Sequence, residues 1–285
     1  MTYLVTGAAG NLGDLAVQAL LDRGVAPGEI VATARDIERL SAFAARGVVT
    51  RRLDYDDHTS VDAALDEVHR LLLVSSNAVG QRLGQHRAVI EAAARTGVEL
   101  VAYTSVLRAD GSSMALAADH VATEQVLAEL GVPHVVLRNG WYLENYTDQV
   151  PVHLEHGSVL GTAGTGRISA AARADYAEAA AVALLADDSA GQVHELAGDE
   201  SFTMADYAAT LAEQSGQTVT YVDLPQAEYV AALESAGVPA AFAEILADSD
   251  RGVAAGDLYD ASGCLSAVIG RPTTPLADVV KAALV

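Results

Sequence analysis

The feature that most constrains the fold is a glycine-rich turn near the start of the chain, from Gly7 to Gly13. The apolar run over residues 2–6 predicts a short buried strand, and from Asn11 onward apolar residues recur at helical spacing. Between a strand and a helix, Gly7 can take a tight-turn conformation, Gly10 lets a phosphate approach the backbone, and Gly13 lets helix and strand pack closely. The helix N-terminus adds N–H groups and a positive dipole. The turn therefore predicts a dinucleotide site, with an ordinary tight turn as the alternative.

Strands and helices alternate regularly through the first half of the chain. After the first strand, further strands are expected over residues 29–34, 47–53, 70–74, 98–104 and 133–138, with helical segments between them. Five strand–helix alternations followed by another strand favour a right-handed, doubly wound parallel sheet. The sequence predicts an α/β protein of the Rossmann type.

The second half of the chain consists of shorter elements, with helices expected over residues 227–236, 240–250 and 276–284. We expect two parts: residues 1–150 as an NADP-binding Rossmann domain, and residues 151–285 as a smaller, mostly helical substrate lobe. A helix near 174–187 and a strand near 193–197 are expected to contribute to the first part.

Charge and composition exclude several classes of partner and location. Acidic residues outnumber basic ones 38 to 17, giving a net charge of −21, so a nucleic-acid surface is not expected. No stretch reaches the roughly 18 apolar residues that a membrane span needs, and a strand beginning at residue 2 or 3 leaves no room for a signal peptide. The single Cys264 rules out an intrachain disulfide and is expected to be a packing residue in a reducing compartment. We therefore expect a cytoplasmic protein. We expect no metal site, because the histidines are not spaced as metal ligands are.

Arg35 follows the second expected strand, at the position that distinguishes the two nicotinamide cofactors. An acidic residue there would bind the ribose hydroxyls of NAD, whereas an arginine can pair with the 2′-phosphate of NADP. Asp36 could accept from a ribose hydroxyl, but we interpret it as the N-cap of the following helix. Arg35 favours NADP, and a solvated surface charge is its alternative.

Polar residues follow the next two strands as well. Asp54 comes where the adenine of a bound dinucleotide lies and could accept from its amino group; capping of the next helix by Asp56 or Asp57 is compatible with this. Ser75 and Ser76 follow the fourth strand and are expected to line the crevice beyond the strand ends, where ligands bind in open α/β sheets.

Several motifs along the chain resemble the NmrA-like group of atypical short-chain dehydrogenase/reductases, and within it the bacterial type 2 NAD(P)H:quinone oxidoreductases. The opening turn is shared by many such proteins and departs from the pattern only at Ala9 and Asn11, where Thr and Gln are expected. More specific are the blocks at residues 80–82 and 85–87, 102–105, 137–142, 173–176, 247–250 and 269–273.

The resemblance implies a cytoplasmic enzyme that binds NADP(H) and reduces a small-molecule quinone, and it leaves a homodimer open. It also implies a set of residues along the cofactor. These are Gly7, Ala8, Ala9, Gly10, Asn11, Leu12, Arg35, Ser75, Asn139, Gly140, Trp141, Tyr142, Leu143 and Glu144, to which we add Asp54 and Ser76 from their positions.

One departure from the wider superfamily bears on the mechanism. A typical short-chain dehydrogenase carries Tyr-x-x-x-Lys on the helix after the fifth strand, with the tyrosine as proton donor. The helix expected over residues 117–130 has no such pair. It carries His120 and Glu124, which one helical turn separates, so that they can meet on one face; a surface ion pair is the alternative.

A quinone needs less acid catalysis than a ketone, because hydride passes directly to its ring and hydrogen-bond donors can hold the developing phenolate. We expect Tyr142 and Asn145 as donors, His120 as a weaker acid candidate, and Asn139 to orient the nicotinamide. Trp141 would form a flat wall for the substrate, which Tyr142 and Asn145 would also contact. Core or lobe-interface packing is the alternative for Trp141 and Tyr142. Arg173 could reach the substrate pocket, although with Asp175 it could instead fix the following helix.

Two other functions remain open from the sequence. One is a reductase of other planar acceptors, such as triarylmethane dyes, on the same fold and cofactor. The other is a redox sensor that binds NADP(H) and reports its state to a protein partner without turnover. The aromatic, polar loop over residues 141–146 favours an enzyme, because a sensor has no need of it.

Overall fold

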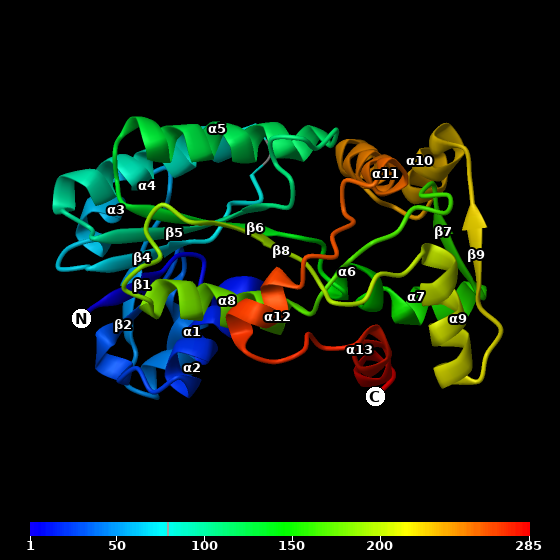
Figure 1. The fold of residues 1–285 in the computed structure, drawn as a ribbon, viewed down its shortest axis with the longest axis horizontal. Helices are drawn as coiled ribbons and strands as arrows, with labels where there is room; N and C mark the ends of the chain where they lie inside the picture. The colour runs from blue at the N-terminus through cyan, green and yellow to red at the C-terminus, as the bar shows by residue number, and fades with distance from the viewer. Residues whose placement is uncertain (79) are drawn as a thin grey trace.

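The computed structural model describes residues 1–78 and 80–285. Its centre is a seven-stranded sheet in the order β3-β2-β1-β4-β5-β6-β8, in which every neighbouring pair is parallel. This order reverses direction after β1, so the predicted doubly wound Rossmann-type sheet is confirmed (Figure 1). The strands are β1 (Tyr3–Val5), β2 (Ile30–Ala34), β3 (Val49–Arg52), β4 (Arg70–Leu73), β5 (Leu100–Val106), β6 (His134–Asn139) and β8 (Val193–Leu196).

Helices cover both faces of this sheet (Figure 1). The central strands are buried along their whole length, as a parallel sheet between two helical layers requires. One layer contains α3 (His58–Ala64), α4 (Arg82–Thr96) and α5 (Ala115–Glu129). The other contains α1 (Asn11–Asp22), α2 (Ser41–Ala44), α8 (Arg173–Leu185) and α12 (Cys264–Ile269), together with short 3-10 turns at Pro27–Glu29 and Ile37–Leu40.

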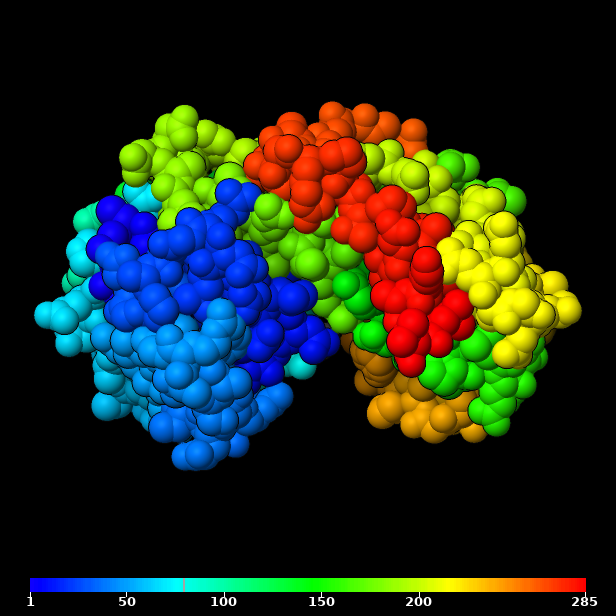
Figure 2. Space-filling view, turned by 90° about the horizontal axis from the view of Figure 1, so that it is seen from below, coloured from blue at the N-terminus to red at the C-terminus, as the bar shows by residue number. Residues whose placement is uncertain are grey.

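The remaining elements form a lobe beyond the carboxyl ends of the strands, around a second apolar core. Figure 2 shows a hollow between this lobe and the blue N-terminal part of the molecule. The lobe is mostly helical, with one two-stranded parallel sheet, β7-β9. Its elements are α6 (Glu144–Thr147), α7 (Val150–His156), β7 (Ser158–Gly161), α9 (Met204–Ser215), β9 (Thr220–Asp223), α10 (Gln226–Ser235), α11 (Ala240–Ala255) and α13 (Leu276–Ala283).

On one side of the molecule, acidic residues of the lobe hold the start of α5. Asp248 on α11 accepts a hydrogen bond from the backbone N–H of Ala115 at 2.7 Å, and so caps a helix that has no cap of its own. Asp257 accepts from the backbone N–H and the hydroxyl of Ser113, at 2.8 and 2.7 Å. The lobe is therefore fastened to the N-terminus of a helix that covers the sheet.

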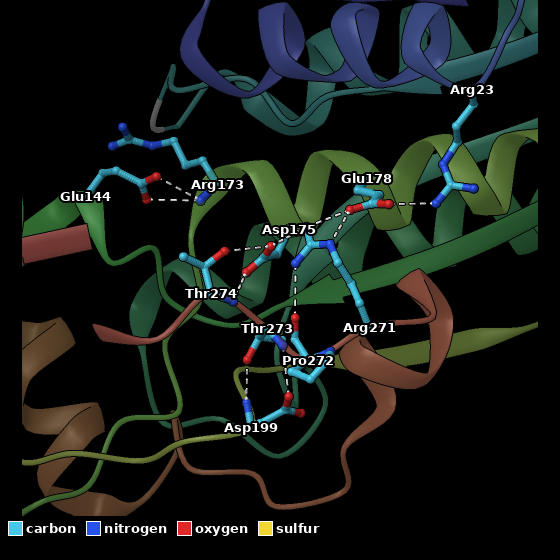
Figure 3. Close-up of polar contacts among 10 residues, drawn as sticks. All are labelled: Arg23, Glu144, Arg173, Asp175, Glu178, Asp199, Arg271, Pro272, Thr273 and Thr274. Atoms are coloured by element: carbon cyan, nitrogen blue, oxygen red, sulfur yellow. Dashed lines mark hydrogen bonds and ion pairs between the residues drawn. The ribbon is translucent and has the colours of Figure 1, made fainter. Parts of the chain in front are cut away.

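On the other side, the segment before α13 is fastened to α8 by a buried carboxylate (Figure 3). Asp175 is fully buried; it accepts from the guanidinium of Arg271 and from the backbone N–H of Thr274, both at 2.7 Å. Arg271 also pairs with Glu178, which in turn pairs with Arg23 at the end of α1. The end of α1 and the C-terminal segment are thus joined through α8.

Gly13 occupies a position that only glycine fits. A Cβ atom there would lie 2.7 Å from the carbonyl carbon of Gly7 and 2.9 Å from the Cα of Ala8, both backbone atoms that cannot turn aside. We expect Gly13→Ala to lower the free energy of unfolding by about 1–3 kcal/mol, the usual cost of overpacking, as measured by urea denaturation. Gly28→Ala is the matched control, since its Cβ meets nothing within 4 Å; equal stability of the two variants would contradict the close packing.

Candidate functional site

The glycine turn forms the floor of the site. Gly7 has φ of +61°, and its carbonyl accepts a hydrogen bond from the N–H of Gly10 at 2.8 Å. The N–H of Ala8 is bound to the Thr33 carbonyl on β2 at 2.8 Å, which fixes the turn against the sheet. The first N–H groups of α1 have no partner within their own helix, so they are the anion donors that the turn offers.

A cavity of about 350 Å³ opens above the turn, and Arg173 forms its opposite wall. Gly10 and Asn11 line it from the turn, and Glu144 lines it beside Arg173. The site therefore combines helix N–H groups with a cation from a different part of the chain, as the acidic net charge requires of any anion site here.

Arg173 is held at its backbone by Glu144 (Figure 3), and its guanidinium makes only long polar contacts. Its N–H donates to both carboxylate oxygens of Glu144 at 3.0 Å, which places a negative charge at the N-terminus of α8. The side chain is 15% exposed and lies over the Tyr142 ring, 5.5 Å from its centroid. Its only polar contacts in the described part of the chain are long, 3.4 Å to Asp148 and 3.5 Å to Asn145. A nearly buried cation with such weak partners suits an anionic ligand.

Two arginines follow β2, beside the glycine turn. Arg35 is exposed directly after the strand. Arg39, which the sequence argument missed, donates to the Ala9 carbonyl in the turn at 2.9 Å. No spacing rule pointed to Arg39, because Arg35 precedes the 3-10 turn Ile37–Leu40 that carries it. The expected N-cap role of Asp36 is confirmed, since its carboxylate accepts from the Glu38 N–H at 3.1 Å.

The loop after β3 is ordered by its own carboxylates. Asp54 pairs with Arg52 at 3.2 Å, and Asp57 caps α3 by accepting from the Ser60 N–H at 3.3 Å. Capping by Asp57 is thereby confirmed. Adenine binding by Asp54 stays a prediction: its side chain is 25% exposed and is already shared with an arginine.

Ser75 and Ser76 lie at the carboxyl end of β4, and side chains of β5 and α4 bind their backbone N–H groups. The Ser75 N–H donates to the Thr104 hydroxyl at 2.8 Å, and the Ser76 N–H donates to Nε2 of His86 at 2.9 Å. The backbone of this turn is therefore fixed from the side opposite the crevice.

Asn139 ends β6, and its amide is incompletely satisfied. The residue is 4% exposed, and its Oδ1 is buried with no hydrogen-bond partner in the part of the chain that the structure describes. Buried polar atoms normally have a partner. An amide donor of a bound ligand would complete Asn139, and the carboxamide of a nicotinamide is such a donor.

The segment after Asn139 sends its side chains in opposite directions. Tyr142 forms a β-bridge with Ala171, packs against the core of the sheet and meets Tyr176 edge to face. Trp141 packs against the core of the lobe instead. The two rings therefore lie on different sides of the segment, because neighbours in an extended segment point to opposite sides.

Gly140 and Leu143 are packed against other parts of the chain. A Cβ on Gly140 would lie 2.9 Å from the Tyr176 hydroxyl, so this glycine permits close packing. Leu143 is 1% exposed, and its N–H donates to the Ala171 carbonyl at 2.9 Å. Neither residue offers a side chain to the crevice.

The two expected hydrogen-bond donors differ in their surroundings. Burial raises the pKa of Tyr142, which keeps its phenol protonated and able to donate. Asn145 is exposed on α6 and within 3.5 Å of Arg173. Both therefore lie beside the Arg173 wall of the cavity.

His120 and Glu124 do not pair, so that part of the sequence expectation is wrong. Glu124 binds Arg138 through both its oxygens, at 3.1 and 2.7 Å, because an arginine at the end of β6 presents a planar fork to it. His120 turns inward instead; its Nδ1 lies 2.8 Å from the Tyr103 hydroxyl and its Nε2 lies 3.4 Å from Arg82.

The environment of His120 makes it a poor acid. The residue is 5% exposed, and burial with the nearby Arg82 charge lowers its pKa to about 3. The imidazole is therefore neutral at neutral pH. A proton-donating role for His120 remains only a prediction, and the geometry favours support of Tyr103.

Within residues 1–78 and 80–285, no three His, Cys, Asp or Glu side chains gather closely enough to hold a metal ion. None of the helices in that part of the chain combines the length and apolar character that a membrane span requires.

The chain is similar to several oxidoreductases along its whole length. It is 48% identical over 277 residues to quinone oxidoreductase 2 of Escherichia coli strain K12, which covers 97% of this chain and 96% of that one. The crystal structure of the E. coli NADPH-dependent quinone oxidoreductase QOR2 with NADPH matches with a TM-score of 0.96, 46% identity and complete coverage of both chains. That of the Citrobacter sp. triphenylmethane reductase with NADP(H) matches with a TM-score of 0.94 and 32% identity, over 99% of this chain and 100% of the other.

The family model agrees with these relatives and with the predicted resemblance. The model described as the NmrA-like family matches residues 1–270, which include the glycine turn, Arg35, Asn139 and Arg173. The chain belongs to the NmrA-like family.

Proposed function

We propose that this protein is an NADPH-dependent quinone reductase that transfers a hydride directly to its substrate. The observation that carries the proposal is the cavity between the glycine turn and Arg173. The unsatisfied Oδ1 of Asn139 at the end of β6 supports it. The 48% identity to the E. coli quinone oxidoreductase, over nearly the whole of both chains, supports a quinone as the acceptor.

The residues of the site fit NADPH from end to end. The α1 N-terminus and the Arg173 guanidinium would hold the diphosphate from opposite sides. Arg35 and Arg39 stand beside the turn, where a 2′-phosphate would lie. The buried Oδ1 of Asn139 would accept a hydrogen bond from the nicotinamide carboxamide and so orient the reduced nicotinamide ring, which would supply the hydride.

The protein contributes position and hydrogen bonds to this reaction. Asn139 fixes the plane of the ring, and the lobe shields the crevice from water. Tyr142 and Asn145 donate hydrogen bonds toward the acceptor oxygen on which charge develops. Water can protonate a phenolate, so no buried acid is needed, in keeping with the neutral His120.

The decisive experiment follows the loss of NADPH absorbance with and without a simple benzoquinone. Quinone-dependent oxidation supports the reductase. Tight NADPH binding without such oxidation would refute it and leave the redox sensor. A triarylmethane dye in a parallel assay tests the other acceptor class, and faster turnover of the dye would contradict the assignment of a quinone.

Arg35 is expected to select the cofactor. Because it is exposed beside the turn and pairs with the 2′-phosphate in the proposal, Arg35→Ala should lose about 1.5–3 kcal/mol of NADPH affinity and little for NADH. The dissociation constants of both cofactors, measured by titration, check this. An equal loss for NADH and NADPH would remove Arg35 from the phosphate site.

We also infer that the protein works in the cytoplasm. The single Cys264, which is unpaired, suits a reducing compartment.

A further inference from the structure

The turn over Ser75 and Ser76 is held by side chains of two elements, β5 and α4. The Ser75 N–H is bound by Thr104 on β5, and the Ser76 N–H by His86 on α4. The Ser76 carbonyl accepts from Nε of Arg82 at 2.6 Å. The Ser76 hydroxyl donates to Gln85 at 2.6 Å. Every polar group of Ser76 thus has a partner, although the residue belongs to a short connection between a strand and a helix.

The contact between Ser76 and His86 determines the tautomer of the histidine. A backbone N–H can only donate, so Nε2 of His86 carries no proton. The proton is then on Nδ1, which lies 3.0 Å from the Thr123 hydroxyl, and that hydroxyl donates onward to the Asp119 carbonyl at 2.9 Å. His86 and Thr123 are both fully buried. His86 is therefore a spacer of fixed orientation between α5 and the turn after β4.

The groups around His86 keep it neutral. The His86 ring meets the Tyr103 ring edge to face at 5.4 Å, and Tyr103 is bound to His120 in turn. Burial opposes protonation of both histidines, and the guanidinium of Arg82, whose distance to the Asp119 carboxylate is 3.9 Å, acts in the same direction. A positive charge beside two buried imidazoles opposes their protonation. The orientation set by the Ser76 N–H is thus stable at neutral pH.

Resting on the proposed function, we propose that His86 is a positioning residue that holds the Ser75–Ser76 turn in the place that the nicotinamide half of NADPH requires. Two of the sequence blocks typical of the family contain Arg82, Gln85 and His86. Neither the glycine turn nor the acceptor site gives these three residues a role. The structure gives these three residues one common partner, Ser76. The turn is at the carboxyl end of β4, next to the strand that carries the glycine turn, where ligands bind in sheets of this kind.

The test replaces each nitrogen of His86 separately. The longer side chain of His86→Gln can place its amide oxygen where Nε2 was, so it keeps an acceptor for the Ser76 N–H and loses the donor to Thr123. The shorter side chain of His86→Asn can keep the donor to Thr123 and leaves the Ser76 N–H buried without a partner. Each variant loses one hydrogen bond of similar kind.

We expect His86→Gln to bind NADPH within about twofold of the wild type, and His86→Asn to bind it about tenfold more weakly, the effect of one unpaired buried donor. A smaller change in kcat than in KM for NADPH should accompany this, with similar unfolding free energies for the two variants. A merely structural role would destabilise both variants alike and leave the two dissociation constants equal, which would overturn the proposal. His156→Asn, at an exposed histidine of α7, is the control.

A second pair of variants decides the matter if the His86 variants do not fold. Thr123→Val removes the acceptor that orients His86, whereas Thr123→Ser keeps it; we expect weaker NADPH binding only for Thr123→Val, and equal binding would contradict the proposal. Binding is measured without an acceptor, so failure of the quinone assay would refute the proposed function while the dissociation constants still decide the role of His86.

Discussion

Replacing Arg173 by methionine should weaken NADPH binding by about 2–5 kcal/mol, the usual cost of truncating one partner of a mostly buried charge pair. The side chain is only 15% exposed and makes no polar contact shorter than 3.4 Å in the described structure, so its charge is available to the diphosphate. Methionine keeps the apolar stem over Tyr142 and removes only the charge. Calorimetric titration with NADPH, and with NADH in parallel, measures the effect.

The expected pattern distinguishes Arg173 from Arg35. Because both cofactors carry the diphosphate, Arg173→Met should weaken NADH and NADPH binding alike, whereas Arg35→Ala should affect NADPH alone. Arg87→Met, at a surface arginine on α4 whose side chain is 40% exposed, is the control for loss of a positive charge. Unchanged cofactor affinity in Arg173→Met, with lower affinity for the quinone, would return Arg173 to the substrate side, as the sequence first suggested.

Lowering the pH should destabilise the protein already at pH values above those at which ordinary carboxylates titrate. Burial lowers the pKa values of His86 and His120 from 6.5 to about 3, so both are neutral in the folded protein. Between these values the unfolded chain binds a proton at each histidine that the folded protein does not bind. Stability should therefore fall as the pH decreases, by about 1.4 kcal/mol per pH unit for each histidine.

Other buried groups modify this slope, among them His194, whose pKa burial also lowers. His153, with its pKa lowered to about 4 by burial, acts in the same direction. Asp250 acts in the opposite direction, because burial raises its pKa from 3.8 to about 6 and the folded state binds its proton first. Urea unfolding at a series of pH values measures the sum, and His86→Gln should reduce the slope. Constant stability from neutral pH down to about pH 5 would show that the two imidazoles are not buried as neutral groups.

The glycine turn and the alternation of strands and helices were enough to predict the sheet, because each depends on residues close together in the chain. The turn at Gly7, the N-cap at Asp36 and the cap at Asp57 are local in the same way. Arg35 could be placed beside the turn because the strand order of a doubly wound sheet makes β1 and β2 neighbours. The family could be inferred because its motifs extend along most of the chain.

Contacts between distant segments could not be predicted in this way. Glu124 binds Arg138 on β6 and not His120 on its own helix, because two charge-assisted hydrogen bonds to a guanidinium are stronger than one contact across a helical turn. The partner of Ser76 is a histidine of the next helix, and no spacing rule connects them. The helix α12 was not expected, because it is short and begins after Gly263, without a polar cap.

The buried carboxylate of Asp175 has a consequence for the C-terminal end of the chain. Its partners Arg271 and Thr274 lie beyond residue 270, the last residue of the family match. A protein shortened after Gly270 would retain a fully buried negative charge with no donor from that stretch and would lose the link from α13 to α6. Proteolytic trimming of residues 271–285 would thus disturb α8 and the arginine at its start, so an affinity tag should extend this end rather than replace it.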